Sequence, residues 1–462
     1  MGVYIWALSL TTIFSVGIDL GLSPLLIREA ARDVGKSERL LRSVIGLKLI
    51  FALGTLIALF VLLALRPPDQ ITFIVVAVAC LVMLFDSFSM TFYSILRARQ
   101  NVNFESFGTL AVNLLVFATG LYLLGIARSP IMAIVALATG SGLNCLFSWS
   151  VVHFKFHLRT RPQFDREAAV SLLRLVAAFA MAGIFVRIYN AADSVLLGYF
   201  SGSAAVGLYS VPAKVVTALQ ALIPGAIIAS IYPAMSHYYV NSRVMLERIF
   251  ERSVGYLLML ALPITGGLLV LIPTLLRTIW PAYASAASTF FLMAIGIPFL
   301  FLTFPSGYLL NACNRQRKNT INRAVITFVN IVLNLLLIPY WGIVGAGIAF
   351  LAANVLLFIL DFSAARDIIP FEWCWVAKLG LKAATATLVM VAVIFLSQSA
   401  VFQLVAKVSL GRAWALLGLL AIGGAVYVAV LAALRVFTRE ELAMMRNLIR
   451  RESEPTVIPP AL

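Results

Sequence analysis

The sequence is poor in charged residues and in residues that carry out chemistry. Asp, Glu, Lys and Arg make up 12% of the 462 residues, against roughly 25% in an ordinary soluble domain. The four cysteines have no CxxC or other metal-ligand spacing, and the three histidines are isolated from any acidic cluster. There is no Walker A loop and no GxSxG, HExxH or DxD motif. These absences argue against a disulfide framework, a metal site, an enzyme and an ATP-driven pump within this chain.

Long apolar runs take the place of the missing charges. Hydrophobic residues make up 62% of the chain. Thirteen runs each have about 20 residues or more, enough for a helix to cross ~30 Å of hydrocarbon. We therefore predict an all-α polytopic membrane protein with thirteen transmembrane helices. The runs are Val3–Ser23, Ser43–Leu65, Ile71–Leu96, Phe104–Ile126, Pro130–Val152, Ala168–Phe200, Gly207–Met235, Ser253–Leu276, Ser285–Leu310, Ala324–Val344, Gly345–Ala365, Cys374–Ser397 and Ala413–Phe437.

The basic residues alternate between the loops. Of the 35 Lys and Arg, 25 fall in every second loop or in the C-terminal tail, and only five fall in the intervening loops. Cytoplasmic loops carry such an excess, so the C-terminus is predicted to be cytoplasmic, in the cytoplasmic (inner) membrane of a bacterium or archaeon. The net charge of +16 follows from this bias. It does not indicate a nucleic-acid partner, because the charges form no continuous face.

Short repeats suggest an internal duplication. Gly-x-Tyr opens the first run at Gly2 and the seventh at Gly207, and Arg-Gln recurs at Arg99 and Arg315 with a similar offset. The offset of 205 places a first helix about 37 residues upstream of Met1, so fourteen helices are expected in a complete chain. The predicted divisions are a first bundle of five helices, with its first helix apparently missing (1–160), a second, six-helix bundle (161–366), two additional helices (367–437) and a cytoplasmic tail (438–462).

Arg187 and Lys214 are the strongest candidates for a substrate site. A charge in the middle of a membrane normally faces a partner or a water-filled cavity. The runs that hold these two residues are joined by a short loop, so we expect antiparallel helices whose cations line one cavity and bind an anion. The alternative is a structural ion pair between Arg187 and Asp193. Lys48 and Arg174 lie nearer a predicted boundary and are expected to extend to it.

Four further charges have open roles. Asp19 and Asp193 lie inside predicted spans, and each could pair with a cation or take up the H⁺ or Na⁺ that drives transport. Lys378 and Lys382 share a helix face. They could bind a lipid phosphate or simply extend to the membrane surface. No other cofactor is expected.

Two stretches resemble a known family. They are Gly2-Val3-Tyr4 through GIDLGLSPLLIREAARD (Gly17–Asp33), and RIYNAADSVLLGYFSGSAAVGLYSVPAKVV (Arg187–Val216). They are similar to polysaccharide-biosynthesis transporters of the Wzx, or O-antigen flippase, type within the multidrug/oligosaccharidyl-lipid/polysaccharide exporter superfamily. The resemblance implies a MATE-like fold of two pseudo-symmetric six-helix bundles, often with two further helices.

The resemblance also implies a function. Such proteins flip undecaprenyl-diphosphate-linked sugars across the inner membrane by alternating access, for O-antigen, capsule or exopolysaccharide, and Arg187 and Lys214 fit their cationic cavity. The implied partners are the lipid-linked oligosaccharide, membrane lipids, and a polymerase and glycosyltransferases. Three alternatives remain open: a lipid II flippase, a drug/cation antiporter, and a non-transporting scaffold of a polysaccharide assembly complex.

Overall fold

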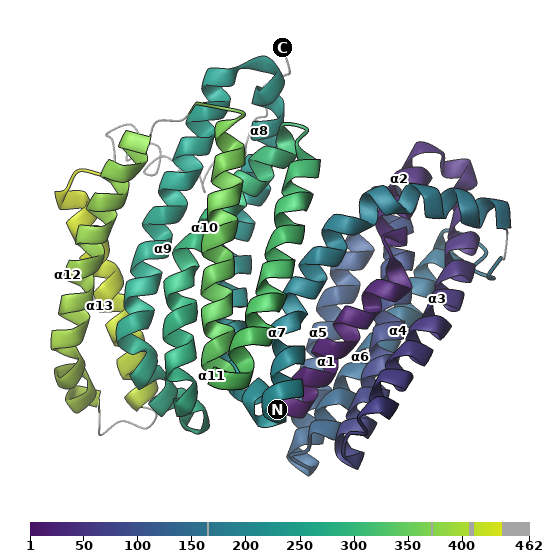
Figure 1. Cartoon of the computed structure of the whole chain (residues 1–462), viewed down its shortest axis with the longest axis horizontal. Helices are drawn as coiled ribbons and strands as arrows, with labels where there is room; N and C mark the ends of the chain where they lie inside the picture. Colours follow the sequence, from purple (N-terminus) through teal and green to yellow (C-terminus); the bar gives the residue numbers. More distant parts are fainter. Residues whose placement is uncertain (164–165, 371–372, 406–410, 437–462) are drawn as a thin grey trace. The chain divides into compact units, whose positions relative to one another are not determined.

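The computed structural model describes the backbone of residues 1–163, 166–370, 373–405 and 411–436, so the predicted tail at 438–462 lies outside the described residues. Every element in these ranges is helical. Eleven helices are long and apolar enough to cross a membrane. The prediction of an all-α polytopic membrane protein is confirmed (Figure 1).

The first compact unit comprises Met1–Lys214 and Arg317–Leu357. Within it α4 packs against α6 and α1, and α5 packs against α6. The N-caps follow helix chemistry: Asp69 accepts a hydrogen bond from the backbone of Thr72 before α4, and Ser129 precedes a proline at the start of α6. The elements are α1 (Gly2–Asp19), α2 (Leu22–Arg32), α3 (Ser37–Leu65), α4 (Gln70–Ala98), α5 (Asn103–Ile126), α6 (Pro130–Ser150), most of α7 (Arg166–Gln220) and most of α11 (Gln316–Arg366).

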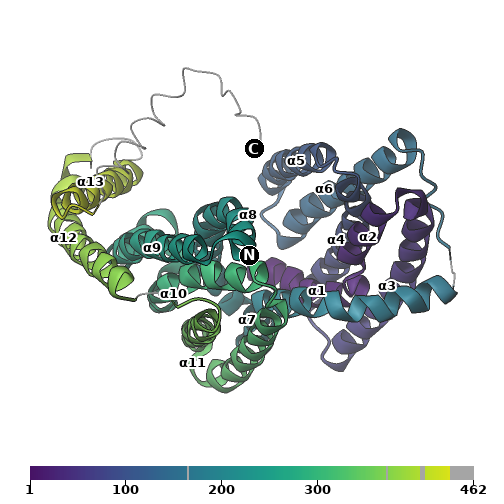
Figure 2. The same cartoon turned by 90° about the horizontal axis from the view of Figure 1, so that it is seen from above.

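The second compact unit comprises Val215–Gln316 and the described residues from Phe358 onward. Helix α12 packs against both α9 and α13, and Figure 2 shows α12 and α13 beside each other next to α9. The predicted bundle boundaries near residues 160 and 366 remain a proposal. The elements that lie wholly in this unit are α8 (Ala226–Asn241), α9 (Arg243–Ile279), α10 (Ala287–Ala312), α12 (Trp373–Val405) and α13 (Gly411–Ala433).

The long helices α7 and α11 are hairpins. Their helical geometry breaks at Gly202 and Gly342, both with positive φ. Tyr209 bonds Asp193 across the first break, although sixteen residues of straight helix would separate them by about 24 Å. Asn334 and Asn354, on either side of the second break, both bond α7. Counting each arm separately, the eleven candidate spans of the described chain contain thirteen long helical arms, which equals the number of transmembrane helices predicted.

The chain also breaks where a single run was predicted. Leu20 and Gly21 both have positive φ, 40° and 86°, and they separate the membrane helix α1 from the short helix α2. Only glycine adopts this conformation readily. The predicted run Val3–Ser23 is therefore too long at its C-terminal end.

A close approach within α11 gives a first prediction. A Cβ on Gly345 would lie 2.6 Å from the carbonyl oxygen of Leu337 in the other arm. Replacing Gly345 by leucine should lower the free energy of unfolding by about 1–3 kcal/mol, because backbone atoms cannot move aside. Thermal unfolding in detergent measures the change. Gly54→Leu is the control, since no atom lies within 4 Å of the place that a Cβ would take there; equal stability of the two variants would contradict the prediction.

Candidate functional site

A cavity of about 210 Å³ lies within the first unit, with polar groups set among a mostly apolar lining. Its walls come from α1 and α4, and one residue of α7 completes it. Hydroxyl groups, two carboxylates and one guanidinium face the space. The lining residues are Leu8, Thr11, Thr12, Ser15, Asp19, Val82, Met83, Asp86, Ser87, Met90 and Arg187.

The helical repeat explains why these residues share one face. Ser15 and Asp19 are four positions apart on α1, and Asp86 and Met90 are four apart on α4. Residues at this spacing lie one above the other on a helix. Each helix therefore presents one face to the cavity. Ala7 and Leu10 of α1 contribute to an apolar core.

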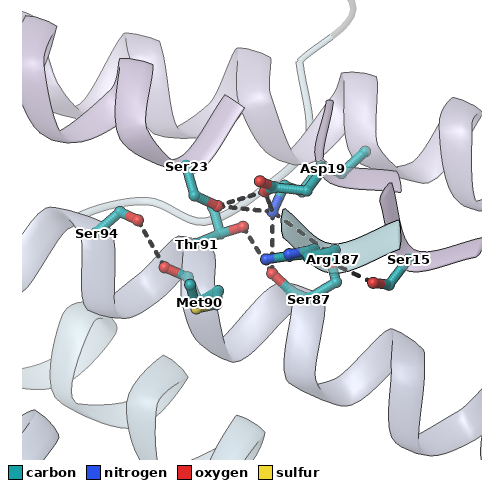
Figure 3. Close-up of polar contacts among 9 residues, drawn as sticks. Ser15, Asp19, Ser23, Ser87, Met90, Thr91, Ser94 and Arg187 are labelled. Atoms are coloured by element: carbon teal, nitrogen blue, oxygen red, sulfur yellow. Dashed lines mark hydrogen bonds and ion pairs between the residues drawn. The ribbon is translucent and has the colours of Figure 1, made fainter. Parts of the chain in front are cut away.

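Arg187 enters the cavity from α7 and is half-buried. Its Nη1 donates a hydrogen bond to Ser15 Oγ at 3.2 Å, and Figure 3 shows this contact. The alternative of an ion pair with Asp193 is wrong, because the carboxylate of Asp193 is bonded to other side chains. Among the described residues, no carboxylate lies within 4.0 Å of the Arg187 guanidinium. The guanidinium therefore has donors left for a ligand.

A buried ion pair lies beside Arg187. Lys48 of α3 has no exposed surface, and its Nζ is 2.6 Å from Asp19 Oδ1. It also bonds Ser23 Oγ at 3.1 Å and the Ser87 carbonyl oxygen at 3.0 Å. The expectation that Lys48 extends to the membrane surface is wrong, because these acceptors hold it inside the unit. Of the two roles predicted for Asp19, the structure shows pairing with a cation.

A second polar cluster surrounds Asp193. Tyr209 Oη donates to its Oδ2 at 2.6 Å, and Asn334 Nδ2 donates to its Oδ1 at 2.7 Å. Asn334 also bonds Asn330 Oδ1 at 3.1 Å. All four side chains are buried, and Asn334 Oδ1 has no hydrogen-bond partner among the described residues. Oxygen atoms are thus concentrated here in an otherwise apolar interior.

The other predicted cations lie elsewhere. Lys214 is exposed and does not line the cavity with Arg187. In the second unit, Lys382 Nζ donates to the Leu434 carbonyl at 3.0 Å, whereas Lys378 is exposed. The side chain of Arg174 lies outside the described ones. The structure therefore does not bring the two predicted cations, Arg187 and Lys214, into this cavity together.

Two charged residues at or beside the site were not predicted there. Asp86 lines the cavity, and Lys48, which was expected to extend to a membrane boundary, pairs with Asp19 instead. The four-residue spacing of Val82, Asp86 and Met90 could have placed Asp86 on a cavity face. No group of three or more His, Cys, Asp or Glu residues that could hold a metal ion occurs in the part of the chain that the structure describes.

The fold defines a class: an all-α, multi-pass membrane protein. The chain belongs to the polysaccharide biosynthesis protein family, whose sequence model matches residues 1–239. The predicted family resemblance is confirmed. A probable flippase, AglR, of Haloferax volcanii is 27% identical over 203 residues, 43% of this chain and 42% of that protein. A probable low-salt glycan biosynthesis flippase, Agl15, of the same organism is 24% identical over 248 residues, 52% of each chain.

The matched regions span about half the length of these relatives. An uncharacterised membrane protein of Methanocaldococcus jannaschii is 26% identical over 60% of this chain and 56% of its own length. Among solved structures, the lipid II flippase MurJ in an inward closed conformation superposes with a TM-score of 0.75 at 17% identity, covering 97% of this chain and 93% of MurJ. An inward-facing MATE family multidrug transporter gives 0.64 at 14% identity, covering 82% and 89%. These superpositions confirm the MATE-like fold.

Proposed function

We propose that the protein is a flippase that moves a diphosphate-linked oligosaccharide, carried on a polyprenyl lipid, across the cytoplasmic membrane. The observation that carries the proposal is the guanidinium of Arg187 in a hydroxyl-lined cavity inside a membrane bundle. Arginine binds phosphate with two parallel hydrogen bonds. Thr11, Thr12 and Ser87 offer hydroxyls, which suit the hydroxyls of a sugar.

The cavity size suggests which part of the substrate it takes. About 210 Å³ is below the roughly 300–1,000 Å³ of pockets for drug-sized ligands. We propose that the diphosphate and the first sugar occupy it, while the lipid tail stays in the bilayer. Lys214, outside the cavity, would contact the anion at another stage of transport, when the two helix bundles have moved in alternating access.

The wider role follows from the family. We propose that the transported glycan serves a surface polysaccharide such as O-antigen, capsule or exopolysaccharide, made together with glycosyltransferases and a polymerase. The C-terminus would lie in the cytoplasm, because the loops rich in Lys and Arg alternate with loops that have few. Lys378 and Lys382 would contact lipid phosphates at the same surface.

Transport would be coupled to a cation at Asp193. The carboxylate of Asp193 and the side-chain oxygen of Asn330 both accept hydrogen bonds from Asn334 Nδ2, and all three side chains are buried. Hard cations prefer oxygen ligands, and a proton would be an equally simple ligand for the carboxylate. Asp193→Asn should therefore abolish the dependence of transport on an imposed H⁺ or Na⁺ gradient, measured with proteoliposomes in each gradient separately. Persistent dependence on either gradient would contradict this role.

The test of the function is complementation of a bacterial strain that lacks its O-antigen flippase, with surface polysaccharide as the readout. Arg187→Gln should lower export about 10- to 100-fold, since a hydrogen bond to a charged group contributes roughly 1.5–3 kcal/mol. Arg97→Gln is the matched control, because that arginine is bonded to Glu105 outside the cavity.

Three outcomes separate the alternatives. Unchanged export by Arg187→Gln would point to a non-transporting scaffold. Rescue of a strain depleted of its lipid II flippase, but not of the O-antigen strain, would point to lipid II as the substrate. Drug resistance without rescue of either strain would point to a drug/cation antiporter.

A further inference from the structure

The buried pair of Lys48 and Asp19 lies directly beside the proposed anion site. Asp19 is one helical turn beyond Ser15, the residue that Arg187 contacts. Asp19 and Arg187 also line the same cavity. A free carboxylate at this place would attract the guanidinium, because opposite charges a few ångströms apart interact strongly away from bulk water.

The structure shows why Asp19 does not form an ion pair with Arg187 and so occupy its guanidinium. Lys48 lies 2.6 Å from Asp19 Oδ1, and the Ser23 hydroxyl donates to the same carboxylate. Lys48 is itself anchored on α4 by the carbonyl oxygen of Ser87. Figure 3 shows Ser23 bonded to Asp19, and Arg187 bonded to Ser15. The carboxylate is thus bonded to Lys48 and Ser23, and Arg187 bonds a hydroxyl instead.

We propose that Lys48 is a positioning residue, which binds the carboxylate of Asp19 and so keeps Arg187 free for the phosphate of the substrate. The inference rests on the proposed flippase function. Lys48 is required for that function although it does not contact the substrate. Loss of Lys48 and loss of the Asp19 charge should then have opposite effects on anion binding. Without Lys48, Asp19 pairs with Arg187 and competes with the anion. Without the charge of Asp19, Lys48 adds positive potential to the cavity.

This asymmetry makes the proposal testable on the purified full chain in detergent, with radiolabelled inorganic pyrophosphate as the probe. Lys48→Met should weaken pyrophosphate binding at least tenfold. Asp19→Asn should tighten it about threefold, and the double variant should bind far better than Lys48→Met alone. A purely structural ion pair predicts instead that both single variants lose binding alike, since each leaves one buried charge unpaired.

Controls keep the proposal falsifiable. The exposed pair of Asp33 and Lys36, 2.9 Å apart, provides matched variants Asp33→Asn and Lys36→Met, which should bind as the wild type does. If Lys48→Met does not fold, the double variant decides: no binding by the folded double variant overturns the inference. Equal losses in the two single variants overturn it also.

The proposed function fails by a different result. The proposed anion site at Arg187 would be contradicted if Arg187→Gln bound pyrophosphate as tightly as the wild type does. It would also be contradicted if the wild-type protein bound no pyrophosphate. If Arg187→Gln loses binding, and Lys48→Met and Asp19→Asn lose it equally, the proposed anion site at Arg187 is supported. Only the proposed role of Lys48 is then overturned.

Discussion

Asp193→Ala is expected to lower the free energy of unfolding by about 1–3 kcal/mol. The change leaves the Tyr209 hydroxyl without its acceptor, and an orphaned buried donor costs roughly 1–3 kcal/mol. The Asn334 amide loses one acceptor but keeps two on Asn330. All three side chains are buried in the first unit, so water cannot easily replace the lost carboxylate. Denaturation in mixed detergent–SDS micelles measures the difference.

Asp193→Asn is the matched variant for this prediction. It keeps one oxygen acceptor and the shape of the side chain, so its loss should be clearly smaller than that of Asp193→Ala. The cluster also connects both arms of α7 to α11, so the loss should appear as earlier separation of these hairpins. An alanine variant as stable as the wild type would show that the carboxylate does not satisfy these donors.

Lys48→Met is expected to cost about 3–5 kcal/mol of unfolding free energy, the usual result of removing one partner of a buried ion pair. The Lys48 side chain is fully buried, so the carboxylate of Asp19 would keep only Ser23 of its present partners. The pairing with Arg187 proposed above would offset only part of this loss. Adding Asp19→Asn should recover most of the loss, because no unpaired charge then remains. Unfolding of the wild type, both single variants and the double variant forms a double-mutant cycle.

The matched control for this cycle is the exposed pair of Asp33 and Lys36. Its hydrogen bond holds the pKa of Asp33 below the ordinary value, yet exposed ion pairs contribute little to stability. Lys36→Met should therefore leave unfolding almost unchanged. Strictly additive losses in the Lys48 and Asp19 cycle would contradict coupling between the two buried side chains.

The sequence predicted the membrane fold well, because hydrocarbon demands long apolar helices whatever their partners. The loop predicted after Phe200 contains the break at Gly202, and the boundary predicted at Val344 lies two residues from the break at Gly342. The break at Leu20 was missed because the run was defined by hydropathy alone, although Gly21 followed by Pro24 is a local signal of a helix end. Gly21 adopts its positive φ readily, whereas the positive φ of Leu20 is uncommon for a residue with a side chain.

The candidate site was predictable only in part. Arg187 stood out because an arginine deep in an apolar run needs a partner or a cavity. Lys48 did not, because its partner Asp19 lies on another helix, and distance from a predicted boundary says nothing about neighbouring helices. Lys214 was placed beside Arg187, but hydropathy does not fix the rotation of a helix about its own axis. The structure turns Lys214 to an exposed position.

The turns of the two hairpins meet at one end of the first unit. A Cβ on Gly342 would lie 3.8 Å from the Ser201 hydroxyl, and Gly2 packs against the backbone of Ser203. Reporter domains inserted here to map membrane sidedness would have to push these backbones apart, and would report on a damaged protein. Sidedness is better determined with small cysteine-reactive probes at exposed positions such as Lys36, where the surrounding chain can accept a label.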